Sequence, residues 1–387
     1  MNKQRVLILS ASVGAGHMRA AAALEQAFQQ IGDGHNVRHI DTLDYATSAL
    51  RGVYSKAYSY AARRLPVITG WLYDAFDQPW RYAPLRLAFN RLNTKPFVAM
   101  LRENKPAFVV CTHFLPAEIL SWLADSDELA IPYFVVVTDF DVHAMWLSRN
   151  CQHFFLATDE ARARMETIGI SGDRITVTGI PIDPVFATPK NKCDMRRKHD
   201  LDSDRPTILV SGNRLSSATL ENIVASLATL PREVQVIVIC GRRPEVCSRV
   251  AEMTARVSWR SSVKFTLVGF VDDIDELMSA SDLLVGRPGG LLTAEALASG
   301  LVFVIVSPIP GQEERNADYL LEENAAIRCN DPTILAYKIE RLLSDPLRYE
   351  FMKKNVARIA RPRAAFDVVD TLRRLANTRA VSAPDST

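Results

Sequence analysis

Short runs of β-branched and other apolar residues alternate along this chain with longer amphipathic segments. The alternation is typical of parallel α/β units, in which a helix carries the chain from one strand to the next. The pattern predicts one set of strands before residue 180 and a second set after residue 206. The predicted strands are Arg5–Ser10, Asn36–Ile40, Phe108–Thr112, Tyr133–Thr138, His153–Ala157, Ile175–Thr178, Thr207–Ser211, Val234–Cys240, Val263–Val268, Leu283–Gly286 and Val302–Val306. We therefore expect an α/β fold with two open, doubly wound sheets.

The chain is long enough, at 387 residues, for two domains of ordinary size. The stretch from Pro181 to Pro206 is rich in proline and charge and lacks sustained apolar periodicity, which is typical of a connector. The predicted organisation is an N-terminal domain over 1–185, a linker over 186–205 and a second domain over 206–362. The last segment, 363–387, is predicted to be a helix followed by a disordered tail from Ala380.

The composition is that of a globular protein in water, with 48% hydrophobic and 23% charged residues. No apolar run approaches the roughly 18 to 20 residues that span a bilayer. The first residues lead straight into a predicted strand, without the features of a signal peptide. The six cysteines form no CxxC pair, which favours reduced thiols. These features predict a cytoplasmic protein.

The sequence Gly-Arg-Pro-Gly-Gly at 286–290 joins an apolar strand to an Ala- and Leu-rich helix. Backbone N–H groups at such a helix start favour a bound anion, and glycines let a diphosphate approach the backbone closely. Glu295 lies about one turn into the helix, where a carboxylate suits the paired hydroxyls of a ribose. The segment therefore predicts a nucleotide-diphosphate pocket.

Three further segments of the second half are candidates to complete this pocket. Gly212 and Asn213 follow the first strand of that half, where a small residue favours a phosphate. Gly269–Phe270 offers backbone groups to the edge of a base. Gln312 and Glu313 follow a Pro-Gly turn and can hydrogen-bond the hydroxyls of a hexose. For each segment an ordinary turn, strand end or helix cap is the alternative.

The first half carries its own glycine turn, Gly14-Ala-Gly16-His17, between a strand and a helix. A ligand can approach closely at Gly16, and His17 can act as a base near neutral pH. A dinucleotide fingerprint is the rival interpretation; it would need Gly or Ala where Arg19 stands, although Asp41 does end the second strand. An exposed histidine on a plain turn is the other alternative.

Polar residues also follow two other predicted strands of the first half. His113 follows the third strand, and Asp139, His143 and Trp146 follow the fourth. Because the carboxyl ends of parallel strands meet at one edge, these side chains should gather around His17. Histidine and carboxylate suit zinc, but the spacing matches no compact ligand motif, so no metal is expected. A structural, hydrogen-bonded histidine is the alternative for each of them.

Residues 45–101 interrupt the α/β rhythm with many aromatic and basic side chains. Such a mixture suits a surface that meets anionic lipid head groups, and Arg63, Arg64, Trp71 and Trp80 are the predicted contacts. One alternative is a helical insertion packed on its own domain. Nucleic acid would accept the same mixture, but we do not expect it as a partner.

Taken together, these segments resemble the monogalactosyldiacylglycerol synthase and processive diacylglycerol glucosyltransferase family. That family belongs to glycosyltransferase family 28 and is related to the lipid II-forming N-acetylglucosaminyltransferase. The similarity extends from about Leu9 to Ile327. It departs from the family at Arg287, where lysine is usual, and at Asn213, where a further glycine is usual. The motifs that carry it are Gly14-Ala-Gly16-His17, Thr138-Asp139 followed by His143 and Trp146, Pro288-Gly289-Gly290 followed by Glu295-Ala296, and Pro308-Ile-Pro310-Gly311-Gln312-Glu313 followed by Asn316.

The resemblance implies a GT-B fold, in which two Rossmann-like domains face a central cleft. It also implies that His17 is the candidate base near the acceptor. The donor contacts that it implies are Gly289, Gly290 and Thr293 for the diphosphate, Glu295 for the ribose, and Gln312, Glu313 and Asn316 for the sugar and phosphate of a UDP-sugar.

We therefore expect an inverting transfer of a hexose from a UDP-sugar to diacylglycerol or a related glycolipid, at the inner face of the cell membrane. His17, with Asp139 as a second candidate, would remove the acceptor proton. Arg287 and the helix start after Gly290 would stabilise the leaving UDP, so no cofactor or metal ion is expected. Two alternatives are a UDP-sugar epimerase on the same fold and a non-catalytic UDP-sugar sensor that docks on membranes.

Overall fold

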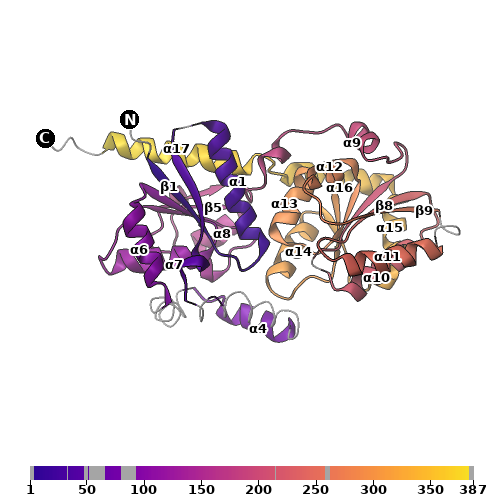
Figure 1. Ribbon diagram of the computed structural model, residues 1–387, viewed down its shortest axis with the longest axis horizontal. Helices are drawn as coiled ribbons and strands as arrows, with labels where there is room; N and C mark the ends of the chain where they lie inside the picture. Colours follow the sequence, from indigo (N-terminus) through magenta and orange to yellow (C-terminus); the bar gives the residue numbers. More distant parts are fainter. Residues whose placement is uncertain are drawn as a thin grey trace. The chain divides into compact units, whose positions relative to one another are not determined.

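The computed structural model describes residues 4–32, 34–47, 51, 66–79, 93–213, 215–257 and 262–382. The chain forms two compact units (Figure 1). The first is built mainly from Met1–Pro184 and Arg361–Thr387, and the second mainly from Val185–Ile309 and Glu313–Ala360. Each unit has its own parallel sheet.

The first unit contains six strands in the order β2-β1-β3-β4-β5-β6, all paired in parallel. The strands are β1 (Arg5–Ser10), β2 (Asn36–Asp41), β3 (Phe108–Cys111), β4 (Tyr133–Val136), β5 (His153–Leu156) and β6 (Ile175–Val177). The helices are α1 (Ala15–Ile31), α4 (Pro66–Phe76), α6 (Lys95–Asn104), α7 (Phe114–Asp125), α8 (Asp159–Thr167) and α17 (Ala364–Ser382), with the short turns η1 (Thr42–Tyr45), η3 (Ala144–Trp146) and η4 (Gly172–Arg174).

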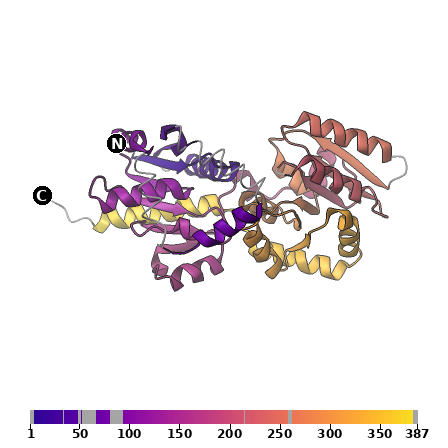
Figure 2. The same cartoon turned by 90° about the horizontal axis from the view of Figure 1, so that it is seen from below.

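Helices cover both faces of this sheet. Successive side chains of a strand point to opposite faces, so alternate residues of one strand lie in two different cores. Val6 and Ile8 lie in a core with α1 and α17. Leu7 and Leu9 lie in a second core with α6, α7 and α8. Helix α17 thus returns from the far end of the sequence to lie beside α1 (Figures 1 and 2). Because both faces of the sheet are covered, its central strands are apolar along almost their whole length.

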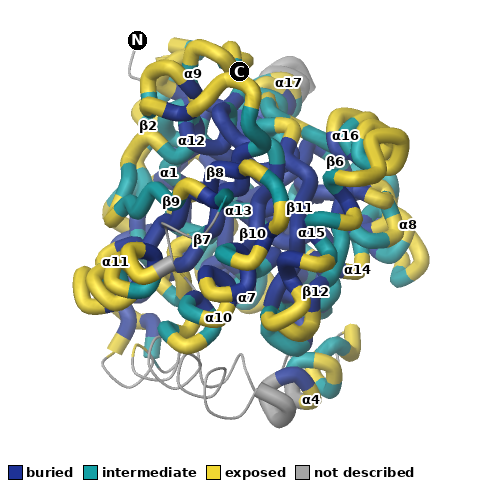
Figure 3. The backbone as a smooth tube through the Cα atoms, turned by 90° about the vertical axis from the view of Figure 1, so that its right-hand side faces the viewer, coloured by how far each residue is buried: buried dark blue, intermediate teal, exposed yellow. Residues whose placement is uncertain are grey.

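The second unit contains six parallel strands in the order β12-β11-β10-β7-β8-β9. They are β7 (Thr207–Ser211), β8 (Val234–Ile239), β9 (Val263–Val268), β10 (Leu283–Gly286), β11 (Val302–Val306) and β12 (Ala326–Cys329). The helices are α9 (Lys192–Lys198), α10 (Ser217–Leu227), α11 (Pro244–Val257), α12 (Ile274–Ala280), α13 (Gly290–Ala298), α14 (Gln312–Glu322), α15 (Leu335–Leu343) and α16 (Pro346–Ile359), with the turns η5 (Pro184–Ala187) and η6 (Pro332–Ile334). Figure 3 shows β8, β10 and β11 in dark blue, since these central strands are buried, whereas α11 and α16 carry exposed segments.

Each sheet reverses its direction of growth beside its first strand. In the first sheet β2 lies on one side of β1 and β3 on the other, and in the second sheet β8 and β10 flank β7 in the same way. Ligands of open parallel sheets bind outside the carboxyl ends of the strands at such a switch point. The fold therefore singles out the loops that follow β1 and β3, and those that follow β7 and β10.

The strand predictions are confirmed, because every predicted run contains a strand whose ends lie within two residues of the expected ones. The α/β, doubly wound fold class is confirmed with them. Strand β12 was not predicted. Its sequence, Ala-Ile-Arg-Cys, is short, and it lies at the edge of the sheet with Arg328 only half-buried, so its apolar signal is weak.

Residues 186–205 differ from the predicted linker. This stretch groups with the second unit, and its helix α9 packs against α12. The attachment is ionic, because Arg196 donates to Asp282 at 2.6 Å and Lys192 donates to the same carboxylate at 2.8 Å. Charged contacts leave no apolar periodicity in the sequence, which explains why the helix was missed.

The C-terminal helix was predicted as a separate segment, whereas α17 belongs to the first unit. It continues through Ser382, so Ala380 is helical rather than part of a tail, and residues 383–387 lie outside the described residues. In the aromatic and basic segment 45–101, Arg63, Arg64 and Trp80 also lie outside them. Among the residues that are described, no helix combines the length and apolar character needed to cross a membrane.

Candidate functional site

The turn after β1 places His17 at the carboxyl edge of the first sheet. His17 is the third residue of α1, and its Nδ1 lies 3.0 Å from the carbonyl oxygen of Thr112 and 2.8 Å from Oγ1 of Thr138. Oγ1 of Thr112 donates to the carbonyl oxygen of His17 at 3.0 Å. Thr112 follows β3 directly and Thr138 lies just after β4, whereas His17 itself lies in the helix that follows β1. Segments that follow three strands of the sheet therefore meet at the His17 ring.

These contacts assign the protons of the His17 ring. A backbone carbonyl can only accept a hydrogen bond, so Nδ1 must carry the proton that it donates to Thr112. In the neutral imidazole Nε2 then carries the lone pair and is the basic nitrogen. At Gly16, no described atom lies within 4 Å of the position that a Cβ would occupy, so this side of the turn leaves room beside the histidine.

His113 and Trp146 lie next to His17, as predicted from the convergence of strand ends. The ring centroids of His17 and His113 are 4.6 Å apart in an edge-to-face arrangement, and the Trp146 ring lies 6.0 Å from His17. His113 caps α7, because its Nδ1 accepts a hydrogen bond from the backbone N–H of Leu115 at 3.1 Å. Burial, with a smaller effect from His17, lowers the pKa of His113 well below its ordinary value. His113 is therefore a neutral, structural neighbour of His17.

The ring nitrogens of His143, a predicted acceptor-side residue, bond two other segments of the first unit. Its Nε2 donates to the carbonyl oxygen of Tyr73 in α4 at 2.8 Å, and its Nδ1 accepts from the N–H of Met145 at 3.1 Å. The nearby carboxylate of Asp77 accepts from the N–H of Ala144 at 2.7 Å. His143 thus fastens the end of α4 to the loop after β4.

Asp139, the second candidate base, is buried beside Thr138. The other carboxylate of the Asp139-Phe140-Asp141 sequence accepts from Arg164 at 2.9 Å and 3.0 Å. Arg164 also pairs with Asp77. Asp139 therefore lies at the site, whereas Asp141 belongs to an ion-pair network with Arg164.

In the second unit the two predicted phosphate turns lie on either side of the switch point. Gly212 follows β7, and a Cβ there would lie 2.6 Å from the carbonyl oxygen of Ile239 and 2.8 Å from Leu220, so only glycine fits. Gly289 is the N-cap of α13 and no side chain caps the helix. The first-turn N–H groups of a helix lack intrahelical partners and suit an anion.

Arg287, Glu313 and Asn316 connect two turns of the second unit. Arg287 Nε donates to Oε2 of Glu313 at 2.9 Å, and the same oxygen accepts from the N–H of Ile309 at 2.9 Å. Asn316 Nδ2 donates to the carbonyl oxygen of Pro288 at 3.0 Å. The turn after β11 therefore supports the glycine turn after β10, and the charge of Arg287 is balanced by Glu313.

The remaining predicted donor residues are distributed around these turns. Thr293 and Glu295 are buried within α13, with exposed fractions of 0% and 1%. Gln312 begins α14. Asn213 and Gly269 follow β7 and β9, and next to Gly269 the Phe270 ring is half-exposed beneath the Arg242 guanidinium, 4.1 Å from its centroid.

Sequence reasoning assigned no role to Thr112 or to Arg243. Arg243 donates to the carbonyl oxygens of Gly212 and Leu215, the latter at 2.8 Å, and so holds the loop after β7. Thr112 is the last residue of a predicted strand, and Arg243 follows Gly241 just beyond one. Position at the carboxyl edge is the signal that could have identified both.

One group of described side chains has the composition of a cation site. His199, Asp273 and Glu276 present ligand atoms within 4.8 Å of one another. Glu276, however, pairs with Lys198 at 2.7 Å and with His199 at 3.0 Å. We interpret the group as an ion-pair cluster that ties α9 to α12, remote from both glycine turns in the sequence.

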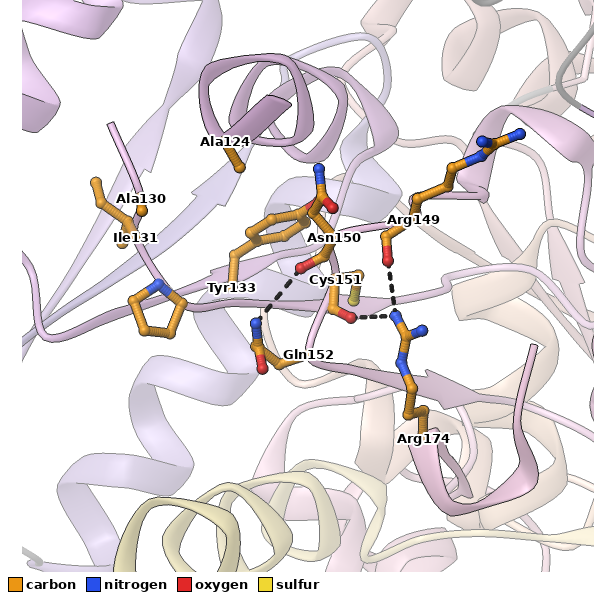
Figure 4. Close-up of a pocket in the computed structure, with 10 residues that line it drawn as sticks. Ala124, Ala130, Ile131, Tyr133, Arg149, Asn150, Cys151, Gln152 and Arg174 are labelled. Atoms are coloured by element: carbon orange, nitrogen blue, oxygen red, sulfur yellow. Dashed lines mark hydrogen bonds between the residues drawn. The ribbon is translucent and has the colours of Figure 1, made fainter. Parts of the chain in front are cut away.

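A cavity of about 580 Å³ lies at the opposite end of the first sheet (Figure 4). It is lined by residues that precede or begin β4 and β5, such as Tyr133 and Gln152. The guanidinium of Arg174 points to the carbonyl oxygens of Arg149 and Cys151, as the dashed lines in Figure 4 show. Since ligands of parallel sheets bind at the carboxyl ends of strands, we do not assign this cavity to the function.

Comparison with protein families gives two matches that together cover most of the chain. Residues 17–182 match monogalactosyldiacylglycerol (MGDG) synthase, and residues 191–359 match glycosyl transferases group 1. The chain is also similar to the processive diacylglycerol beta-glucosyltransferase of Bacillus mycoides (strain KBAB4). The two are 29% identical over 380 residues, which cover 95% of this chain and 93% of the relative.

Solved structures share the fold at low sequence identity. The crystal structure of MurG from Acinetobacter baumannii superposes with a TM-score of 0.60 and 17% identity, over 96% of this chain and 99% of that one. The UDP-GlcNAc 2-epimerase of Neisseria meningitidis, bound to UDP-GlcNAc, gives a TM-score of 0.59 and 14% identity, over 96% of this chain and 100% of the other. The GT-B fold is therefore established, and it is shared by MurG and by an epimerase.

The low pKa of His113 predicts a pH-dependent stability that His113→Asn removes, since asparagine can still cap α7. Below pH 6.5 the unfolded chain binds a proton that folded His113 does not, so stability falls as pH falls. Between pH 7.5 and 5.5 wild type should lose about 1.4 kcal/mol more than the variant. Urea unfolding followed by tryptophan fluorescence measures the difference, because four of the five tryptophans lie in the first unit. Equal losses in both proteins would contradict the assignment, since the other histidines titrate in both.

Proposed function

We propose that this glycosyltransferase acts as its relatives of the monogalactosyldiacylglycerol synthase and processive diacylglycerol glucosyltransferase family are named to do, and that it transfers a hexose from a UDP-sugar to diacylglycerol or a related glycolipid. The similarity to the Bacillus relative supports this substrate class, because it extends over 95% of the chain. The observation that carries the proposal is the placement of a glycine turn at the switch point of each sheet, with a histidine at one turn and a buried carboxylate after the other.

The second unit is proposed to hold the UDP-sugar. The diphosphate would lie at the start of α13, where first-turn N–H groups and the helix dipole favour negative charge. Gly212 would let a phosphate approach the loop after β7. Glu295 would accept hydrogen bonds from the two ribose hydroxyls. Arg287 would add positive charge, attenuated by its pairing with Glu313.

The first unit is proposed to supply the base. The acceptor oxygen would attack the anomeric carbon while the bond from that carbon to the UDP oxygen breaks, and the hydroxyl proton would pass to Nε2 of His17. A single displacement of this kind inverts the anomeric centre. The start of α13 would stabilise the charge that develops on UDP, so transfer should need no divalent ion.

The transfer assay uses vesicles that contain diacylglycerol, a panel of labelled UDP-sugars, and chromatography of the lipid extract. Wild type should transfer the labelled sugar of one of these donors to the lipid. It should do so also in the presence of EDTA. His17→Ala should lose transfer by roughly 100-fold or more, the contribution of a general base, and should still bind UDP. His35→Ala is the matched control, because His35 precedes β2 at the opposite end of the sheet. Consumption of UDP-sugar without any labelled lipid would favour the epimerase, and binding without turnover would favour the sensor.

The donor pocket is tested by calorimetry with UDP. Glu295→Ala should weaken UDP binding by roughly 1.5 to 3 kcal/mol, the range for losing hydrogen bonds to a charged group. Glu276→Ala removes a carboxylate of the same unit that is paired with Lys198, and should leave the affinity unchanged. Equal affinities of wild type and Glu295→Ala would exclude the proposed ribose contact.

We further propose that α4 contacts the membrane that presents the acceptor. Trp71 is 68% exposed on this helix and Phe76 is 44% exposed, so large apolar side chains face water there. Flotation with vesicles that contain anionic lipid should recover less Trp71→Ser than wild type. Tyr337→Ser is the matched control, because Tyr337 is an equally exposed aromatic residue, at 61%, in the second unit. Equal recovery of all three proteins would exclude α4 as a contact.

A further inference from the structure

The hydrogen bonds around His17 give distinct tasks to two threonines of the same site. Oγ1 of Thr138 lies 2.8 Å from Nδ1 of His17 and thus contacts the ring itself. Oγ1 of Thr112 instead donates to the main-chain carbonyl of His17 at 3.0 Å, and the carbonyl of Thr112 faces Nδ1. One hydroxyl thus contacts the ring and the other contacts the backbone of the same residue.

Both threonines are buried, with exposed fractions of 4% for Thr138 and 0% for Thr112. Water therefore competes little for their hydrogen bonds. A threonine side chain also has few rotamers, because its branched Cβ restricts χ1. The two acceptors that face Nδ1–H are consequently fixed in place by the backbone after β3 and by a stiff side chain after β4.

We propose that Thr138 is a positioning residue of the transfer reaction, whose hydroxyl, together with the carbonyl of Thr112, holds His17 in the orientation and tautomer that leave Nε2 basic. The inference rests on the proposed role of His17 as the base. It assigns to a neutral hydroxyl and a carbonyl the task that a carboxylate performs in a Ser-His-Asp triad.

The reason lies in the charge that forms during the reaction. When Nε2 takes the acceptor proton, the ring becomes an imidazolium and both of its N–H groups become stronger donors. The oxygens of Thr138 and Thr112 accept the hydrogen bond of Nδ1–H and stabilise this charge. Loss of one of them leaves Nδ1–H with a single acceptor and lets the ring rotate or exchange tautomers.

The test compares Thr138→Val, Thr138→Ser and Thr178→Val in the full chain. Valine keeps the shape of threonine and removes the hydroxyl, whereas serine keeps the hydroxyl. Thr138→Val should lower kcat about 10- to 100-fold, the range for partners that orient a metal-bound histidine, with the KM for UDP-sugar within about 2-fold of wild type. Thr138→Ser should restore most of the rate.

Thr178→Val is the matched control for a merely structural effect. It removes the hydroxyl of another threonine buried just after a strand of the first sheet, where it donates to the carbonyl oxygen of Gly179 at 3.1 Å. The contacts of His17 Nδ1 stay in place, so kcat should stay within about 3-fold of wild type. Comparable thermal midpoints of the two valine variants would show that their difference in rate is not a difference in folding. Equal loss of kcat in both variants would overturn the proposal, and so would full activity of Thr138→Val.

A second readout needs no turnover. The ¹⁵N chemical shifts of the His17 ring in the full chain without substrate should report a protonated Nδ1 in wild type and in Thr178→Val. Thr138→Val should show a mixture of tautomers, because the ring can then rotate away from the carbonyl of Thr112. An unchanged pattern in Thr138→Val would overturn the positioning role even if no acceptor had been found. If wild type fails to transfer sugar while this pattern holds, the proposed function is wrong and the placement of the ring is right.

Discussion

The order of the strands determines where the two glycine turns lie and why a ligand can bind there. Where consecutive strands are added to opposite sides of the first strand, the loops at their carboxyl ends diverge, and neither following helix covers the edge between them. In the first unit this edge lies between β1 and β3, and in the second between β7 and β10. Backbone N–H groups, short side chains and a histidine lie at these edges, where open parallel sheets bind their ligands.

Side chains from neighbouring segments form hydrogen bonds with the residues of these turns. Glu313 and Asn316 hold the turn after β10 through Arg287 and through the carbonyl of Pro288. Arg243 holds the loop after β7 in a comparable way. A turn that must present N–H groups to phosphate cannot also satisfy its own carbonyls by regular structure, so neighbouring side chains satisfy them. Glu313 and Asn316, which belong to the family motif, therefore support the turn and are also candidate ligand contacts.

The sequence predicted the parts of this protein that depend on local signals. Buried parallel strands are apolar along their length, so their positions could be read to within two residues, and glycine at a strand end marked both sites. Contacts that join distant segments left weaker signals. Helix α9 is attached by charges such as Arg196, and His143 resembles His113 in the sequence, although its nitrogens bond the backbone of α4 and η3. Which histidine is basic and which is structural depends on partners that only the folded chain supplies.

Helix α17 has a consequence for how the polypeptide reaches this state. Its buried face, with Val368 and Leu372, closes one side of a sheet whose strands were all made before the second unit was synthesised. A chain emerging from the ribosome must therefore leave that apolar surface uncovered until α17 has been synthesised. The first unit begins to be translated before the second but is completed after it, and removal of α17 would expose the core of the first unit.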